Sequence, residues 1–226
     1  MSTRLPSDRN KSAFSLIELL VVIAIIGIIG AFAVPAAGQL LKGSSLTQAA
    51  NMLTDQCAAA RQQALARNRS VEVRFYNFAN PEQPGESVAD TSTWKYRALQ
   101  YFEIADGGIP NPTGKVTRFA DTIVMNPETT LSSVLGGLTV NKPGMNDPDL
   151  PRGVGKNYSY VAFRFQPDGA TSLSPTGGPA NGLWFITCHL ETDLVRTSAN
   201  TPPPNFFTWM IDPVSGSTKI MRPGVK

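Results

Sequence analysis

The sequence contains few of the residues that build metal centres and disulfide frameworks. Its 226 residues include one histidine, His189, and two cysteines, Cys57 and Cys188. This scarcity excludes a metal centre made of several His or Cys ligands, and it excludes a disulfide-dense small scaffold. No combination of nucleophile, base and orienting group is recognisable, and a single strand histidine is usually a packed one. We therefore expect no enzymatic activity, no catalytic residues, no cofactor and no metal site.

Charged residues are also scarce, at 16% of the chain. Lys and Arg total 20 against 17 Asp and Glu, which gives a formal net charge of +3. A surplus this small does not by itself indicate nucleic-acid binding. Apolar residues reach 42%, which is enough for a hydrophobic core and excludes a wholly disordered chain.

Proline and glycine are absent from one long stretch, Ser44 to Asn80, whereas 16 of the 18 prolines lie after residue 80. Both residues interrupt regular helix, so their absence favours a helical segment there. The chain therefore contains two differently built regions.

Residues Phe14 to Leu41 form an apolar run of 28 residues in which Glu18 is the single charge. A helix of this length spans roughly 42 Å, more than the hydrocarbon core of a bilayer. The preceding segment is basic, since it contains three basic residues, Arg4, Arg9 and Lys11, and one acidic residue, Asp8. The positive-inside rule then predicts a single-pass membrane protein with a cytoplasmic N-terminus and an extracytoplasmic C-terminal part.

Three interpretations fit this run. A signal peptide would be cleaved near the small residues of Ala33 to Ala37, and a passive anchor would simply span the bilayer. Neither has a use for Glu18, whose burial in lipid costs about 3 kcal/mol on insertion scales. The third interpretation is therefore a functional acid that has a partner within the apolar phase.

The residues Ser12-Ala13-Phe14-Ser15-Leu16-Ile17-Glu18 resemble the cleavage and methylation signature of type IV pilins and type II secretion pseudopilins. The resemblance implies that a prepilin peptidase cuts between Ala13 and Phe14 and methylates the new amino group of Phe14. It makes Glu18 the fifth residue of the mature chain and gives Pro35 the place of a kink-inducing proline. The residue before the cut is usually Gly, so Ala13 departs from the pattern.

The same resemblance gives Glu18 a partner. Its carboxylate would neutralise the α-amine of Phe14 on a neighbouring subunit, which cancels two desolvation costs and sets the axial register of a filament. The implied partners are the prepilin peptidase and methylase, other pilin or pseudopilin subunits, the inner-membrane assembly platform and the lipid bilayer. The filament itself would be periplasmic or lie at the cell surface.

Residues 42–69 predict an amphipathic helix, and from residue 70 the pattern changes to the period of two that is typical of strands. The apolar stripe of the helix contains Leu46, Ala50, Leu53, Cys57, Ala60 and Ala64. The expected strands are Val71–Phe75, Trp94–Ile104, Val116–Met125, Tyr158–Gln166, Leu183–Leu190, Phe206–Ile211 and Thr218–Met221, and the expected polar loops are Asn80–Thr93, Asn141–Asn157 and Ser198–Asn205. The predicted fold class is α+β, pilin-like, with a long N-terminal helix on antiparallel sheet. The domains would be a leader (1–13), a transmembrane and assembly helix (14–41), an amphipathic helix (42–69) and a β-rich head (70–226).

Two further stretches, Ala59 to Phe75 and Phe163 to Leu173, resemble minor pseudopilins of the GspH/FimT type. The overall arrangement is also similar to the prepilin-type group called Verru_Chthon cassette protein D. The implied function is that of a structural subunit, a minor pseudopilin, in a type IV pilus-like or type II secretion filament.

Two alternative functions stay open. A DNA-binding minor pilin for DNA uptake would use the basic C-terminus of Lys219, Arg222 and Lys226, but loss of the leader leaves only 17 basic against 16 acidic residues. Because DNA binding needs a concentrated basic stripe, we expect nucleic acid not to be a partner. The other alternative is a passively membrane-anchored extracytoplasmic β domain.

Several residues have two interpretations each. Cys57 and Cys188 both point at a core, so they either form a disulfide, which would close a loop of about 130 residues and add several kcal/mol, or remain two separate thiols. Asp147 and Asp149 either bind calcium or are solvated. The basic end of the helix, formed by Arg61, Arg67 and Arg69, fits the helix dipole better than a ligand site.

Overall fold

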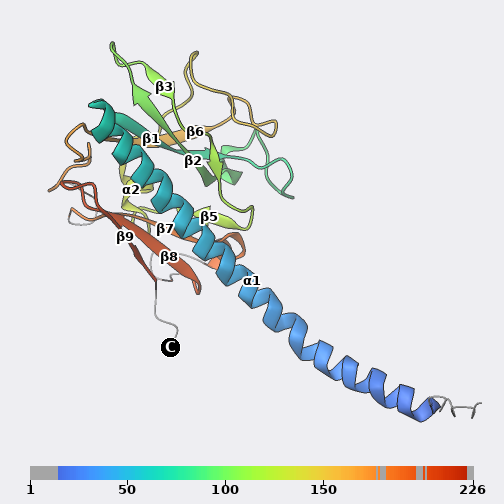
Figure 1. Ribbon diagram of the computed structural model, residues 1–226. Helices are drawn as coiled ribbons and strands as arrows, with labels where there is room; N and C mark the ends of the chain where they lie inside the picture. Colours follow the sequence, from blue (N-terminus) through green and yellow to red (C-terminus); the bar gives the residue numbers. More distant parts are fainter. Residues whose placement is uncertain (1–14, 177, 179–181, 197–200, 202, 223–226) are drawn as a thin grey trace, which may run out of the picture. The chain divides into compact units, whose positions relative to one another are not determined.

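The computed structural model describes residues 15–176, 178, 182–196, 201 and 203–222 (Figure 1). The chain forms two compact units, Met1–Leu41 and Lys42–Lys226. Each unit is described separately below.

The helix α1 covers Leu16–Arg67. Ser15 caps its start, because the Ser15 Oγ accepts the Ile17 N–H at 3.3 Å and the Ser15 carbonyl accepts those of Glu18 and Leu19. The helix ends at Arg67, the next residue Asn68 has a left-handed φ of 52°, and the Arg69 N–H donates to the Ala64 carbonyl at 3.3 Å. This is the Schellman arrangement that satisfies a carbonyl of the last turn.

In the second unit, α1 packs on the sheet through the apolar stripe expected from the sequence. Its buried members are Leu46, Ala50, Leu53, Cys57, Ala60 and Ala64, all at most 5% exposed. They share one core with inward side chains of the strands, among them Phe75, Phe163 and Trp209. The small alanines let the helix approach the sheet closely, so the α+β prediction of a helix on antiparallel sheet is confirmed.

All strand pairs in the sheet are antiparallel, in the order β6-β1-β2-β5-β7-β8-β9, with β3 and β4 also paired to β2. The strands are β1 (Val71–Phe78), β2 (Lys95–Ile104), β3 (Pro110–Pro112), β4 (Thr117–Arg118), β5 (Ile123–Met125), β6 (Ser159–Phe165), β7 (Trp184–Leu190), β8 (Phe206–Ile211) and β9 (Thr218–Met221). The expected strand Val116–Met125 is wrong as one element. A turn in which the Ile123 N–H donates to the Ala120 carbonyl at 2.8 Å divides it into β4 and β5.

A β-bulge interrupts the pairing of β1 with β2. Tyr76 pairs with Ala98 and Asn77 pairs with Tyr96, so Arg97 is the extra residue. A bulge of this kind redirects the side chains around it. Arg97 is 1% exposed although it is charged, and Asn77 borders a groove described below.

The far face of β1, β2 and β6 is covered by the segment between α2 (Ser133–Gly137) and β6. Leu150, Val154 and Tyr158 of this segment pack with Tyr76 and Phe102 of the sheet in a second core. The interpretation of Asn141–Asn157 as a polar loop is therefore incomplete, because its few apolar residues cover this face of the sheet.

Along part of β7, two side-chain hydroxyls accept backbone N–H groups that would otherwise bond to a neighbouring strand. The Ser133 Oγ accepts the Phe185 N–H at 2.9 Å, and the Ser132 Oγ accepts the Thr187 N–H at 3.0 Å. Both serines are fully buried. They satisfy backbone donors that the short β5 does not reach. The described elements are completed by two 3₁₀ turns, Thr91–Thr93 and Glu191–Arg196.

Candidate functional site: the N-terminal helix

The first turns of α1 expose apolar side chains around the whole helix. Among residues 16–29 the exposed fraction of the large apolar side chains runs from 42% at Val22 to 82% at Leu16. A helix of a water-soluble protein normally shows one polar face, and this segment shows none. These side chains therefore require an apolar environment that this chain does not supply within its described residues.

Glu18 is the single charge of this segment and lies in the first turn of α1. Its side chain is exposed and has no ion-pair or hydrogen-bond partner among the described residues. A carboxylate near a helix N-terminus is favoured by the dipole, but that interaction alone does not offset its transfer into an apolar phase. Any neutralising partner must therefore come from outside the described part of this chain.

The other predicted positions of the processing motif are only partly visible. Ala13 and Phe14 lie outside the described residues. Pro35 lies inside α1, whose helical assignment continues through it. The kink at Pro35 stays a prediction.

Within the part of the chain that the structure describes, no helix combines the length and the apolar character that crossing a membrane requires.

Cys57 on α1 and Cys188 on β7 are both fully buried in the core between helix and sheet. The structure has them as free thiols, and burial raises the pKa of each well above its usual range. Both are therefore protonated and poorly reactive in this state. Their pairing as a disulfide stays a prediction, which mass mapping under non-reducing conditions tests.

The basic end of α1 is paired within the molecule. Arg69 contacts Asp106 at 2.9 Å, and Arg67 lies 3.7 Å from Glu103. Arg61 donates from Nε to two carbonyls, of Gly169 at 3.2 Å and of Ser215 at 3.1 Å. The dipole interpretation missed these contacts, because nothing in local spacing indicates which turns meet the helix.

His189 is a structural residue. It is fully buried, its Nδ1–H donates to the Leu190 carbonyl at 2.8 Å, and its Nε2 accepts from the Asn126 amide at 3.1 Å. Burial lowers its pKa, although the Leu190 carbonyl and Asp193 act in the opposite direction. The ring is neutral at pH 7 and has no access to a substrate.

Asp147 binds an arginine of the sheet. Its carboxylate accepts from Arg74 Nη1 at 2.8 Å and from the Gly144 N–H at 2.8 Å. Arg74 is 3% exposed, also bonds Glu72, and lies over the rings of Phe102 and Tyr160. Burial alone lowers the pKa of Arg74, but the hydrogen bonds to Asp147 and Glu72 raise it overall. Among the described residues, no three His, Cys, Asp or Glu side chains come together as metal ligands.

Residues 8–34 match the family model described as the prokaryotic N-terminal methylation motif. This chain carries a prepilin-type N-terminus. The match begins within the leader and includes Ala13, Phe14, Glu18 and the exposed apolar turns of α1, so the resemblance to a prepilin-type cleavage and methylation motif is confirmed for this segment.

Comparison with solved structures finds a similarity to the minor pseudopilin EpsH from the type 2 secretion system of Vibrio cholerae. The sequence identity is 8%, the alignment covers 80% of this chain and 99% of that chain, and the TM-score is 0.43. No curated protein matches the chain. The finer resemblance to GspH/FimT-type subunits stays a prediction.

Proposed function

We propose that this protein is a structural subunit, a minor pseudopilin, of a type IV pilus-like or type II secretion filament. The observation that carries the proposal is the methylation motif over residues 8–34 together with an apolar helix that exposes hydrophobic side chains on every side. A prepilin peptidase cuts between Ala13 and Phe14 and methylates Phe14. The mature chain then enters the filament through residues 14–41.

In this proposal Glu18 selects the position of each subunit. The cut creates a positive α-amine at Phe14 that is as costly in an apolar phase as the carboxylate of Glu18. Pairing the amine of one subunit with Glu18 of the next removes both costs, and any other axial position leaves two unpaired charges. The exposed Leu, Ile and Val side chains supply packing but no register.

Before assembly, residues 14–41 hold the chain in the inner membrane, with the N-terminus in the cytoplasm and residues 42–226 outside. The basic leader supports this orientation. The partners are then the prepilin peptidase and methylase, the assembly platform and other pilin or pseudopilin subunits. DNA binding has less support, because loss of the leader leaves 17 basic against 16 acidic residues and so no large basic surplus.

The test is the mass and N-terminal sequence of the protein isolated from membranes of a strain with and without its prepilin peptidase. We expect a chain that begins at a methylated Phe14 only when the peptidase is present. An intact Met1 or a terminus near Pro35 in both strains would contradict the proposal.

The role of Glu18 is tested in the same strain with Glu18→Ala, and with Asp55→Ala as the control, since Asp55 is an exposed acid in the second unit. We expect Glu18→Ala to leave membrane insertion intact and to reduce recovery in sheared or pulled-down filaments at least tenfold, an effect on the order of 1.4 kcal/mol. Normal recovery of Glu18→Ala, or an equal loss with Asp55→Ala, would remove Glu18 from the assembly step.

A further inference from the structure

A groove of about 650 Å³ lies in the second unit between the loop before β2 and the segment before β6. Its volume is in the range of sites that hold small molecules or short peptide segments. Its wall combines apolar groups with two lysines and contains no carboxylate. The lining residues are Asn77, Val88, Thr91, Trp94, Val140, Lys142, Pro143, Lys156, Asn157, Tyr158 and Ser159.

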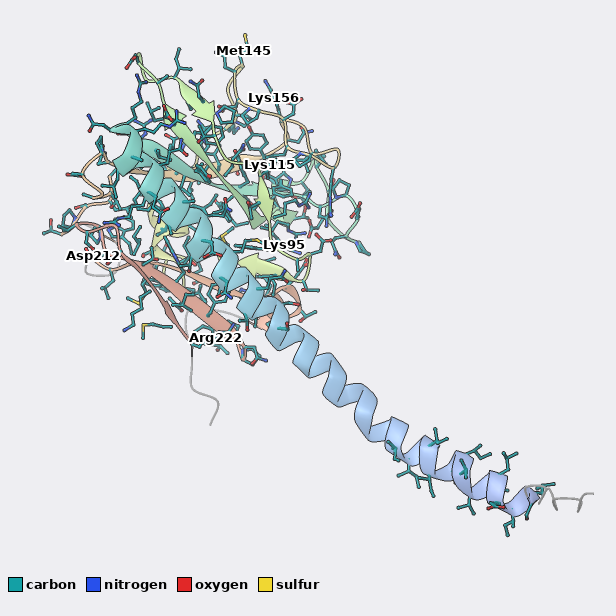
Figure 2. The ribbon with its side chains drawn as sticks, in the orientation of Figure 1. Lys95, Lys115, Met145, Lys156, Asp212 and Arg222 are labelled. Carbon is teal, nitrogen blue, oxygen red and sulfur yellow. The ribbon has the colours of Figure 1, made fainter. Side chains whose placement is uncertain are left out.

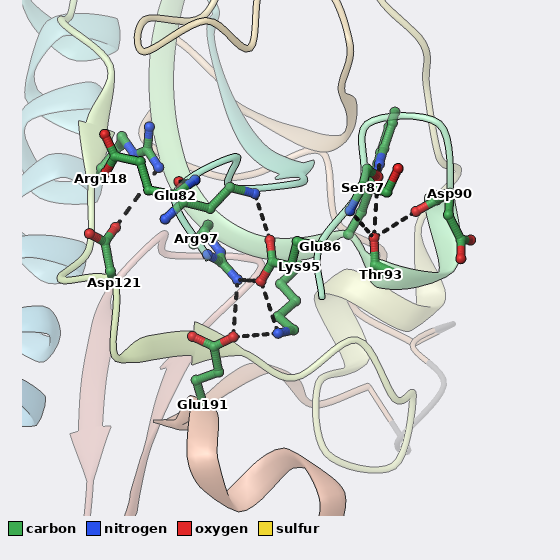
Figure 3. Close-up of polar contacts among 12 residues, drawn as sticks. Glu82, Glu86, Ser87, Asp90, Thr93, Lys95, Arg97, Arg118, Asp121 and Glu191 are labelled. Atoms are coloured by element: carbon green, nitrogen blue, oxygen red, sulfur yellow. Dashed lines mark hydrogen bonds and ion pairs between the residues drawn. The ribbon is translucent and has the colours of Figure 1, made fainter. Parts of the chain in front are cut away.

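The apolar wall is held in place by the structure around it. The Trp94 indole N–H donates to the Ser87 carbonyl at 3.1 Å, and Thr93 Oγ1 accepts the Ser87 N–H at 3.0 Å (Figure 3). The preceding Glu86 is 3% exposed and bonds Lys95 at 2.9 Å and Arg97 at 2.6 Å. A loop that is fixed before binding loses little conformational entropy on binding.

Polar groups at the groove lack partners of their own. The Asn77 Oδ1 is buried and accepts no hydrogen bond among the described residues. Lys142 is exposed and has neither an ion-pair nor a hydrogen-bond partner there. The ammonium of Lys142 is therefore available to an anionic group of another molecule.

Lys156 adds a second positive charge beside the groove. Its Nζ donates to the Met145 carbonyl at 2.6 Å, which fixes the ammonium while its charge stays without a carboxylate (Figure 2). Met145 itself is 93% exposed. Asp90, in the loop before β2, caps the turn Thr91–Thr93 and accepts from Ser92.

We propose that this groove binds a carboxylate-bearing segment of another protein chain, with an apolar side chain next to the acid. The apolar side chain packs on Trp94, and the carboxylate pairs with Lys142. Charge complementarity selects the acid, because the wall offers two ammonium groups and no carboxylate. This site is separate from the N-terminal helix and does not depend on the proposed filament function.

The experiment uses the full chain in detergent micelles and two blocked peptides, acetyl-Asp-Leu-Asp-Leu-amide and its neutral counterpart acetyl-Asn-Leu-Asn-Leu-amide. The readout is the indole N–H resonance of Trp94. Trp184 and Trp209 are 4% and 0% exposed and provide internal controls. We expect a saturable shift of Trp94 alone with the acidic peptide, and binding of the neutral peptide that is weaker by a factor of about three to five.

Lys142→Gln should weaken binding of the acidic peptide by about the same factor and leave binding of the neutral peptide unchanged. The matched control is Lys115→Gln, since Lys115 is an exposed lysine before β4 that does not line the groove (Figure 2). The proposal is overturned if Trp94 does not move, if both peptides bind equally, or if the two lysine variants behave alike. If the oligonucleotide (dT)₈ shifts the Trp94 resonance and binds more tightly than the acidic peptide, the ligand of the groove is nucleic acid and the proposal is also overturned.

Discussion

The guanidinium of Arg61 on α1 joins two turns that lie 108 and 154 residues further along the chain. One turn contains Gly169 and leads out of β6, and the other connects β8 to β9 through Ser215 and Gly216. Both carbonyls accept from the same Nε–H of Arg61, which forms a three-centre hydrogen bond. The contact fixes the helix against both turns of the sheet.

Gly216 makes this close approach possible. Its φ is +64°, and a Cβ at this position would lie 2.2 Å from the Gly169 carbonyl oxygen and 3.0 Å from Arg61 Nε. Gly85 also has a positive φ, of +85°, but nothing lies within 4 Å of its Cβ position. An alanine at Gly85 therefore adds backbone strain alone, whereas an alanine at Gly216 adds backbone strain and a steric clash.

We predict that Gly85→Ala lowers the free energy of unfolding by about 1 kcal/mol and Gly216→Ala by about 3 kcal/mol or more. Urea unfolding followed by tryptophan fluorescence measures both. Equal losses would mean that the carbonyl of Gly169 moves aside without cost.

Burial of His189 is expected to make the free energy of unfolding depend on pH. Its pKa in the folded chain is lowered from the ordinary value of 6.5, chiefly by burial. Below about pH 6.5 the unfolded chain therefore binds a proton that the folded chain does not, and the free energy of unfolding falls as the pH decreases. It is regained above that pH.

The chain has one histidine, so the assignment is direct. We expect the unfolding free energy of the parent to decrease between pH 7.5 and pH 5.5, and that of His189→Gln to stay nearly level over the same range. A His189→Gln variant with an unchanged slope would assign the pH dependence to another group.

At the scale of elements, the strands were the most predictable feature. Alternating apolar residues placed β1, β2, β7, β8 and β9 close to their observed bounds, because a strand with one buried face must repeat every two residues. β3 was missed, since two of its three residues are prolines, which argue against a strand. β3 can form with two prolines because it is an edge strand that pairs with β2 on one side alone, and an edge strand does not need every backbone N–H as a donor.

The segment between α2 and β6 is fixed to the sheet by a contact across 73 residues, from Asp147 to Arg74. Asp147 is 10% exposed and Asp149 of the same segment is exposed. Removing the Asp147 charge leaves the buried Arg74 with Glu72 as its one remaining carboxylate partner among the described residues, so part of the cost of burying Arg74 is no longer offset.

We predict that Asp147→Asn lowers the free energy of unfolding by about 2–4 kcal/mol and speeds amide exchange in residues 141–157. Asp149→Asn, the matched control, should stay within about 0.5 kcal/mol of the parent. Similar effects of the two substitutions, measured by urea unfolding and hydrogen exchange, would show that the pair does not hold the segment.

At the scale of the whole molecule, the two units use their apolar residues in opposite ways. The described part of the second unit buries most of its large apolar side chains in two cores, whereas the large apolar side chains from Leu16 to Ile29 are exposed. A first unit of this kind is complete only in a different medium or against other chains. The proposed assembly through residues 14–41 would supply those contacts.

The sequence by itself determined the N-terminal motif, the helical character of residues 16–67 and most strands. These are local patterns, in which residues a few positions apart share one face or one recognition site. Only the tertiary structure decided that Asp147 meets Arg74, that Arg61 meets two turns, and that Trp94 and Lys142 border one groove. Each of these joins residues dozens of positions apart, and spacing along the chain carries no information about which loops the folded sheet brings together.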